Sequence, residues 1–209
     1  MEPVVNDMNR QTIIFISLLM VLAVALVTAG YATGRGPLGV ISSGISRLTS
    51  GPQMIPSRTL VNENKAPLAP EISGGEWINS EPLTLQSLRG RVILIEFWTF
   101  ACYNCRNTLP TIKKWDTEYR KQGLTVIGVH TPELDIERNP DSLRREITAL
   151  GITYPVITDN DYATWKAYKV EAWPTLFMID KQGRIRWTHV GEGAYAETED
   201  VIKTLLAER

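Results

Sequence analysis

Cysteine and histidine are scarce in this sequence. Among its 209 residues there are 2 histidines and 2 cysteines, and the cysteines, Cys102 and Cys105, lie in one short stretch. A structural zinc site usually needs four ligands, and the isolated His130 and His189 do not have ligand spacing, which argues against a bound metal. A purely structural disulfide is also disfavoured, because a bridge across two intervening residues closes too small a loop to stabilise the fold much.

An excess of charge of either sign is missing as well. Lys and Arg number 22, Asp and Glu number 23, and the formal net charge is -1. Without a basic field to hold a phosphate backbone, nucleic acid is not expected as a partner. No internal repeat or low-complexity module appears. A composition of 44% hydrophobic and 22% charged residues predicts one well-buried domain plus additional segments.

One long apolar run stands at the N-terminus. The run from Thr12 to Ala29 contains no charged residue, and its length is close to that of a helix that crosses a bilayer. The run is longer than the apolar core of most signal peptides, and the segment before it is barely basic, so an anchor is favoured over a cleaved signal. We therefore predict an anchor or signal-anchor over residues 1–30. The rest of the chain is expected outside the cytoplasm, in the periplasm or on the outer face of the plasma membrane.

Residues 31–70 are rich in Gly, Ser, Pro and Thr and contain no apolar period long enough for a packed element. This composition predicts a flexible linker, and the folded domain is expected over residues 71–209. Within it, the continuous apolar run at 91–98 predicts a strand buried on both faces, and the apolar spacing at 102–122 predicts a helix.

The alternation of strand and helix patterns continues to the C-terminus. Further strands are predicted at 124–130, 153–159, 175–180 and 184–190, and further helices at 141–151, 162–168 and 197–207. For the helix at 141–151, Asn139 or Asp141 is the predicted N-cap and Gly151 the stop. Strands joined by helices and finished by a hairpin predict an α/β fold with a central mixed sheet and helices on both faces.

The two cysteines occupy the start of the predicted helix at 102–122. Unpaired backbone N–H groups and the positive end of the helix dipole stabilise a thiolate there, so the pKa of Cys102 should be lowered. A thiolate attacks disulfides and is a good leaving group, and Cys105, one turn further on, can reach back to form an intramolecular disulfide. A pair of inert buried thiols is the remaining alternative.

The stretch "EFWTFACYNCRNTLP" resembles the thioredoxin signature, in which an aromatic-rich strand leads to a C-x-x-C pair and a proline follows, here Pro110. The later "AWPTLFMID" resembles the segment that carries the fold's cis-proline. The apolar N-terminus and an extra strand–helix unit between these motifs resemble TlpA- and ResA-like membrane-tethered thioredoxins. The motifs "GVHTPE", "DNDYATW" and "GEGAY" are most similar to the C-terminal thioredoxin domain of DipZ-type proteins. This chain does not have the many membrane helices of DipZ.

The resemblance assigns roles to particular residues. It implies that Pro174 forms a cis peptide and helps to seat a bound partner strand, with Trp173 shaping the fit. Glu96, in an otherwise apolar strand, matches the buried acid of many thioredoxins, and there its pKa would be raised and it could exchange a proton with Cys105. Trp98 is predicted to wall the cysteine site and contact substrate. The final residues of interest, Tyr103 and Asn104, lie between the cysteines, where the resemblance implies that they tune the redox potential.

These observations predict a thiol–disulfide oxidoreductase that reduces exported proteins, with apocytochrome c among the candidate substrates. Its partners would be protein thiols and disulfides, a membrane or extracytoplasmic electron donor, and the membrane itself through the N-terminal helix. The redox-active Cys102–Cys105 disulfide would serve in place of a cofactor. An alternative is a metal-carrying or redox-sensing module that uses the dithiol without turnover. A peroxide-reducing relative is disfavoured because no upstream cysteine is present to attack peroxide.

Overall fold

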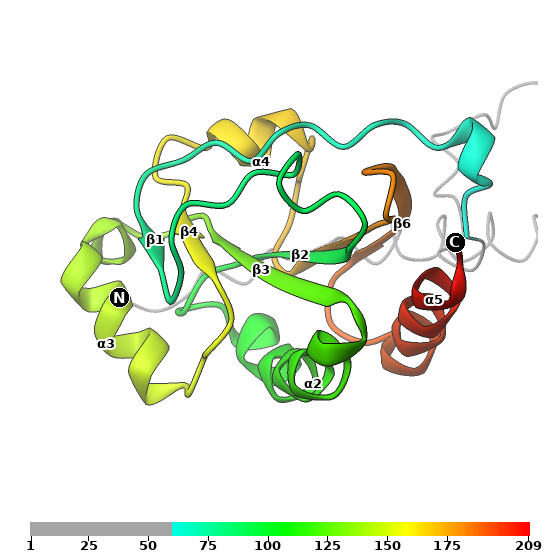
Figure 1. Ribbon diagram of the computed structural model, residues 1–209. Helices are drawn as coiled ribbons and strands as arrows, with labels where there is room; N and C mark the ends of the chain where they lie inside the picture. The colour runs from blue at the N-terminus through cyan, green and yellow to red at the C-terminus, as the bar shows by residue number, and fades with distance from the viewer. Residues whose placement is uncertain (1–59) are drawn as a thin grey trace, which may run out of the picture. The chain divides into compact units, whose positions relative to one another are not determined.

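Six strands form one sheet, in the order β1-β4-β3-β2-β5-β6, in the computed structural model, which describes residues 60–209 (Figure 1). The strands are β1 (Trp77–Ile78), β2 (Val92–Trp98), β3 (Leu124–His130), β4 (Val156–Thr158), β5 (Thr175–Ile179) and β6 (Ile185–Val190). Strands β2, β3 and β4 run parallel, whereas β1, β5 and β6 pair antiparallel with their neighbours. The predicted mixed sheet and thioredoxin-like fold are confirmed, although the short β1 was not predicted.

Helices cover both faces of this sheet, as predicted. Helices α2 (Tyr103–Tyr119), α3 (Pro140–Ala149) and α5 (Tyr195–Ala207) lie on one face, and α4 (Ala163–Ala167) lies on the other (Figure 1). Short 3-10 helices complete the elements, at η2 (Glu63–Lys65), η3 (Arg120–Gln122) and η4 (Asp135–Arg138). Every residue of β2 is buried, because alternate side chains enter the two apolar layers on either side of the sheet.

The ends of the helices follow local sequence signals. Helix α2 and the 3-10 turn η3 after it stop at Gly123, whose φ of 112° requires a residue without a side chain. Of the two predicted caps for α3, Asn139 is the one observed, since its side chain accepts a hydrogen bond from the Ser142 N–H at 3.0 Å. Helix α5 begins at Tyr195, two residues before the predicted start.

Strand register brings three chain segments to one edge of the sheet. Trp98 at the end of β2 lies opposite His130 at the end of β3, and Phe97 lies opposite Thr175 at the start of β5. The loop that leads from Trp98 to the cysteines, the loop after His130 and the turn before Thr175 therefore meet at this edge. The carboxyl ends of parallel strands are the usual location of sites in open α/β sheets.

The predicted linker extends too far at its C-terminal end. Residues 60–69 follow the outer edge of β6 instead of forming a flexible tether: Val61 exchanges hydrogen bonds with Arg186, Pro67 accepts from the Ile185 N–H at 2.9 Å, and the Ala69 N–H donates to Gly183. Ala66 is only 3% exposed. The segment lacks a periodic apolar pattern because it is held by backbone hydrogen bonds to an edge strand.

The predicted N-terminal anchor and most of the predicted linker, residues 1–59, lie outside the described residues. In residues 60–209 no helix combines the length and the apolar character that a membrane crossing needs.

A chain shortened to residues 71–209 should be less stable than one shortened to 60–209. Removing residues 60–70 exposes the outer edge of β6 and leaves Arg186 without Val61. We expect the free energy of unfolding to fall by about 2–4 kcal/mol, at roughly 1 kcal/mol for each hydrogen bond lost. Urea unfolding of both chains measures the difference. The exposed Glu63 gives a control, Glu63→Ala in the longer chain, which should leave the midpoint unchanged; equal midpoints for the two lengths would contradict the prediction.

Candidate active site

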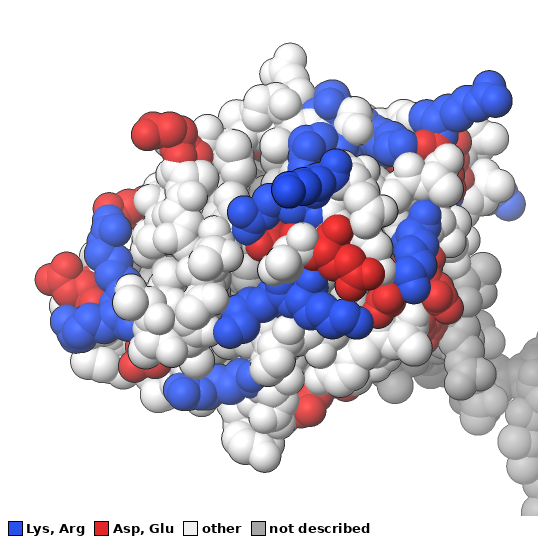
Figure 2. All heavy atoms as spheres, turned by 60° about the horizontal axis from the view of Figure 1, so that its bottom comes forward, with Lys and Arg blue, Asp and Glu red and all other residues white. Residues whose placement is uncertain are grey.

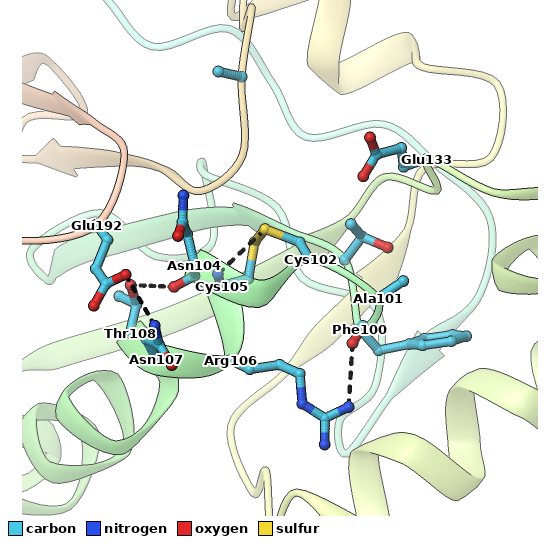
Figure 3. The surroundings of a disulfide bond; sticks show 12 residues. Phe100, Ala101, Cys102, Asn104, Cys105, Arg106, Asn107, Thr108, Glu133 and Glu192 are labelled. Atoms are coloured by element: carbon cyan, nitrogen blue, oxygen red, sulfur yellow. Dashed lines mark hydrogen bonds between the residues drawn. A yellow bond between two sulfur atoms is a disulfide. The ribbon is translucent and has the colours of Figure 1, made fainter.

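The two cysteines differ in access to solvent. Cys102 is the N-cap of α2 and is half-buried, whereas Cys105 is 0% exposed. A disulfide joins them, with their Cα atoms 5.3 Å apart, and the Cys105 N–H donates to Cys102 Sγ at 3.2 Å (Figure 3). After reduction, this N–H and the helix dipole would stabilise a thiolate on Cys102, which is also the sulfur that a partner can reach.

The two residues between the cysteines face solvent. Tyr103 is 76% exposed and Asn104 is also exposed, so both can contact a bound protein directly. The predicted role of this pair in tuning the redox potential stays a prediction.

Glu96 is a buried acid, as the sequence predicted. Its side chain is 0% exposed, one carboxylate oxygen accepts a hydrogen bond from the Tyr154 hydroxyl at 3.0 Å, and the other oxygen has no partner among the described residues. Burial raises the pKa of Glu96 to about 8, although the Tyr154 hydrogen bond opposes the shift. Leu94 and Trp98, its neighbours on the same face of β2, belong to the apolar cluster that includes Cys105.

Trp98 lies in the core beneath the site and does not form its wall. Its side chain is 0% exposed, and its ring meets the His130 ring edge to face at 5.3 Å. Gly128 makes room for it, because a Cβ at that position would lie 2.8 Å from Trp98 Nε1. The predicted contact between Trp98 and substrate is therefore wrong: any influence on a partner must pass through the residues that cover it.

The predicted cis-proline is confirmed, since the Trp173–Pro174 peptide is cis. Pro174 precedes β5 at the same sheet edge as the cysteines, is buried, and its carbonyl accepts from the Gly191 N–H at 2.7 Å. Trp173 is half-buried and packs against Trp165 with ring centroids 4.4 Å apart. Its position fits the predicted part in shaping which partner segment can dock, and that role stays a prediction.

Sequence reasoning missed Glu137, which lies with His130 behind the loop before Cys102. Glu137 in η4 is 1% exposed and accepts hydrogen bonds from Thr99 and Ala101, and His130 is 0% exposed with its ring stacked on Phe100 at 5.5 Å. Burial lowers the pKa of His130 to about 4, so its imidazole is neutral near pH 7. Nothing in the sequence around Glu137 distinguishes it from the other charged residues of the same segment, so no local signal could have identified it.

Charge is mixed on the face formed by α2, α3 and α5, where Lys and Arg side chains lie among Asp and Glu (Figure 2). Around the disulfide, Glu133 and Glu192 lie to either side of the cysteines (Figure 3). In the part of the chain that the structure describes, no group of three or more His, Cys, Asp and Glu side chains is arranged to hold a metal ion.

Replacing Glu96 with Gln should change how stability depends on pH. The pKa of Glu96 is about 8 in the folded protein against a reference of 4.5, so its stabilising contribution is complete below pH 4.5 and is lost as the pH rises towards 8. Between pH 5 and 8.5 the wild type should lose about 4 kcal/mol relative to Glu96→Gln. Urea unfolding at both pH values measures this loss.

The exposed Glu118 on α2 supplies a control for the change in net charge, as Glu118→Gln. The wild type and Glu118→Gln should follow the same pH dependence. If Glu96→Gln followed it too, Glu96 would not be the buried acid described above.

Two proteins of known sequence are similar to this chain over its folded domain. Protein DipZ of Mycobacterium tuberculosis is 42% identical over 142 residues, which cover 66% of this chain but 20% of DipZ, so the chain spans about a fifth of the length of that relative. Thiol-disulfide oxidoreductase YkuV of Bacillus subtilis is 29% identical over 140 residues, which cover 66% of this chain and 94% of YkuV.

A solved structure of a thiol-disulfide isomerase is similar to this chain in sequence and in fold. The thiol-disulfide isomerase from Corynebacterium glutamicum is 30% identical and superposes with a TM-score of 0.64, over 70% of this chain and 99% of that one. The model of the AhpC/TSA family matches residues 68–188, which is more than half of the chain and includes both cysteines and Pro174. The chain therefore belongs to the AhpC/TSA family, and within it carries the thioredoxin-like fold and the paired cysteines of a thiol–disulfide oxidoreductase.

Proposed function

We propose that this protein reduces disulfides of exported proteins outside the cytoplasm, where its N-terminal segment tethers it to the membrane. The observation that carries the proposal is the asymmetry of the cysteine pair: Cys102 is accessible at the amino end of α2, and Cys105 is completely buried behind it. An accessible sulfur suits attack on a partner, and a shielded one suits resolution of the intermediate.

The reaction proceeds in two exchanges. The Cys102 thiolate attacks one sulfur of a substrate disulfide, the substrate S–S bond breaks, and the departing substrate thiolate takes up a proton. A mixed disulfide between Cys102 and the substrate remains. Cys105 then loses its proton and attacks Cys102 Sγ, which releases the second substrate thiol and forms the Cys102–Cys105 disulfide. Two electrons have passed to the substrate, and an extracytoplasmic donor must return them.

Glu96 is suited to move the proton of Cys105. Its pKa of about 8 means that both protonation states are populated near neutral pH, so it can accept a proton and release it again in each cycle. Its unpartnered oxygen is available for that proton. In the same reaction, Pro174 and Trp173, at the sheet edge beside the cysteines, would seat the partner's backbone.

The sequence supports the proposed location of the protein, and a family resemblance supports the proposed direction of electron flow. The uncharged run from Thr12 to Ala29 has the length of a membrane helix and precedes the whole domain. Resemblance to TlpA- and ResA-like tethered thioredoxins favours reduction, with apocytochrome c as one substrate. We take the electron donor to be a membrane or extracytoplasmic partner that reduces the Cys102–Cys105 disulfide after each cycle.

A Cys105→Ser variant of the full-length protein should accumulate mixed disulfides with its substrates in cells. Without the resolving thiol, the adduct on Cys102 cannot be released from within the protein. Non-reducing electrophoresis should show adducts that disappear on treatment with dithiothreitol. Cys102→Ser is the matched control and should trap nothing, because Cys105 is 0% exposed. Absence of adducts in Cys105→Ser would contradict the mechanism.

The reduction potential tests the direction of electron flow. A reductase should have a potential near or below about -250 mV when equilibrated with glutathione redox buffers, whereas strong oxidants of this fold lie near about -120 mV. The full-length protein should also reduce insulin with dithiothreitol as the donor. A potential in the oxidant range would refute the reductase assignment, and turnover of hydrogen peroxide without insulin reduction would refute disulfide exchange as the activity.

A further inference from the structure

Glu137 accepts four hydrogen bonds in a site that solvent does not reach. Its side chain is 1% exposed. One carboxylate oxygen accepts from the Thr99 hydroxyl and, at 2.9 Å, from the Ala101 N–H. The other oxygen accepts from the N–H groups of Glu133 and Leu134, both at 2.8 Å. A buried carboxylate with this many donors is fully satisfied in its ionised form.

These four donors come from two different loops at the active-site edge. Thr99 and Ala101 belong to the loop between β2 and α2, which leads directly into Cys102. Glu133 and Leu134 belong to the loop between β3 and η4, which Figure 3 shows on the same side of the disulfide as Ala101. One side chain thus joins the loop that carries the reactive cysteine to the loop that borders it.

Phe100 anchors the middle of the loop before Cys102 in the apolar core, but the loop's other polar contacts are weaker than those to Glu137. The Cys102 N–H donates to the Thr99 carbonyl at 3.3 Å, so a shift of Thr99 is passed directly to Cys102. Arg106 donates to the Phe100 carbonyl at 3.4 Å, a long bond from a half-exposed side chain (Figure 3). His130 Nε2 lies 3.5 Å from the Thr99 hydroxyl oxygen, which is too long to hold it firmly.

Burial alone would push the Glu137 carboxyl towards its neutral form. The hydrogen bonds from Thr99, Ala101, Leu134 and Glu133 outweigh this effect and hold the pKa of Glu137 below its usual range. The carboxylate is therefore an anion throughout the neutral range, and it has no part in the proton transfer assigned to Glu96. Its four hydrogen bonds instead hold two loops together.

We propose that Glu137 is a positioning residue for disulfide exchange: it locks the Thr99–Ala101 loop against the Glu133–Leu134 loop and so keeps Cys102 at the amino end of α2. The proposal rests on the proposed function of the cysteine pair. If the lock is released, Thr99 and Ala101 lose their acceptor, the Cys102 N–H loses a fixed partner, and the Cys102 sulfur moves away from the N–H groups that stabilise its thiolate.

Glu137→Asp in the full-length, detergent-solubilised protein is the sharpest test. Aspartate keeps the charge, but its side chain is one methylene shorter and cannot reach both loops, so it separates geometry from electrostatics. Two quantities are measured below the unfolding temperature. One is the apparent pKa of Cys102, from the pH dependence of iodoacetamide alkylation with the modified thiol identified by mass spectrometry. The other is kcat/KM for insulin reduction.

In Glu137→Asp the apparent pKa of Cys102 should rise by about half a unit or more. The value of kcat/KM should fall about tenfold or more, as expected when a reacting group is displaced by a fraction of an ångström to an ångström.

Asp180→Asn is the matched control for general destabilisation. Asp180 is also buried, at 1% exposed, and accepts N–H bonds from Gln182 and Arg184, but it follows the end of β5 that lies away from Pro174. Asp180→Asn should lower the midpoint of thermal unfolding and leave the pKa of Cys102 and kcat/KM of the folded protein unchanged.

The outcomes distinguish failure of the positioning role of Glu137 from failure of the proposed reductase function. If Glu137→Asp lowers only the unfolding midpoint, as Asp180→Asn does, the positioning role is refuted while reduction by the wild type stands. If the wild type fails to reduce insulin but Glu137→Asp still shifts the pKa of Cys102, the positioning role stands and the proposed function falls. Should Glu137→Asp not fold, Thr99→Val removes one donor and retains the carboxylate; an unchanged pKa and rate in that variant would refute the role.

Discussion

Burial of β2 on both faces is the constraint on which the whole site depends. All seven of its residues are buried, and it pairs with β3 along its full length and with β5 on its other side. A shift of register by one residue would turn every side chain of β2 to the opposite face of the sheet. Glu96 and Trp98 would then lie on the face away from α2. The position of the strand end, and therefore of Cys102, is set by this packing.

Two buried carboxylates, Glu96 in β2 and Glu137 in η4, have pKa values shifted in opposite directions. Both Glu96 and Glu137 are almost completely removed from solvent, so burial alone disfavours the charge on each. Glu96 accepts one hydrogen bond and has one oxygen unpartnered, and its pKa rises to about 8. Glu137 accepts four, and its pKa falls. Glu96 lies deeper in the protein than Glu137 and also has fewer donors, and both differences separate a group that can move protons from a fixed anion.

The long elements could be predicted because their patterns are local. The apolar run of β2, the residues of β3 and the spacing along α2 are each strong enough to indicate their structure, and Gly123 and Asn139 mark boundaries by their own conformational preferences. β1 has only two residues, and residues 60–69 are held by the edge of β6, so neither carries a pattern that could be read in advance. Trp98 was misjudged because closeness to the cysteines in sequence does not reveal whether a side chain lies at the surface or below it.

The sequence by itself determined the α/β class, the paired cysteines at a helix start and the acid in an apolar strand, because each depends on residue types at short spacing. The thioredoxin-like fold and the proline before β5 were predicted from the resemblance of several motifs to a known family. Only the tertiary structure decided which sulfur is shielded, that Trp98 is core, and that Glu137 joins two loops. Those facts depend on contacts between residues that are far apart in the chain. Thr99 and Glu137 form a hydrogen bond because β2 and β3 end at the same edge of the sheet, and no local sequence pattern predicts that contact.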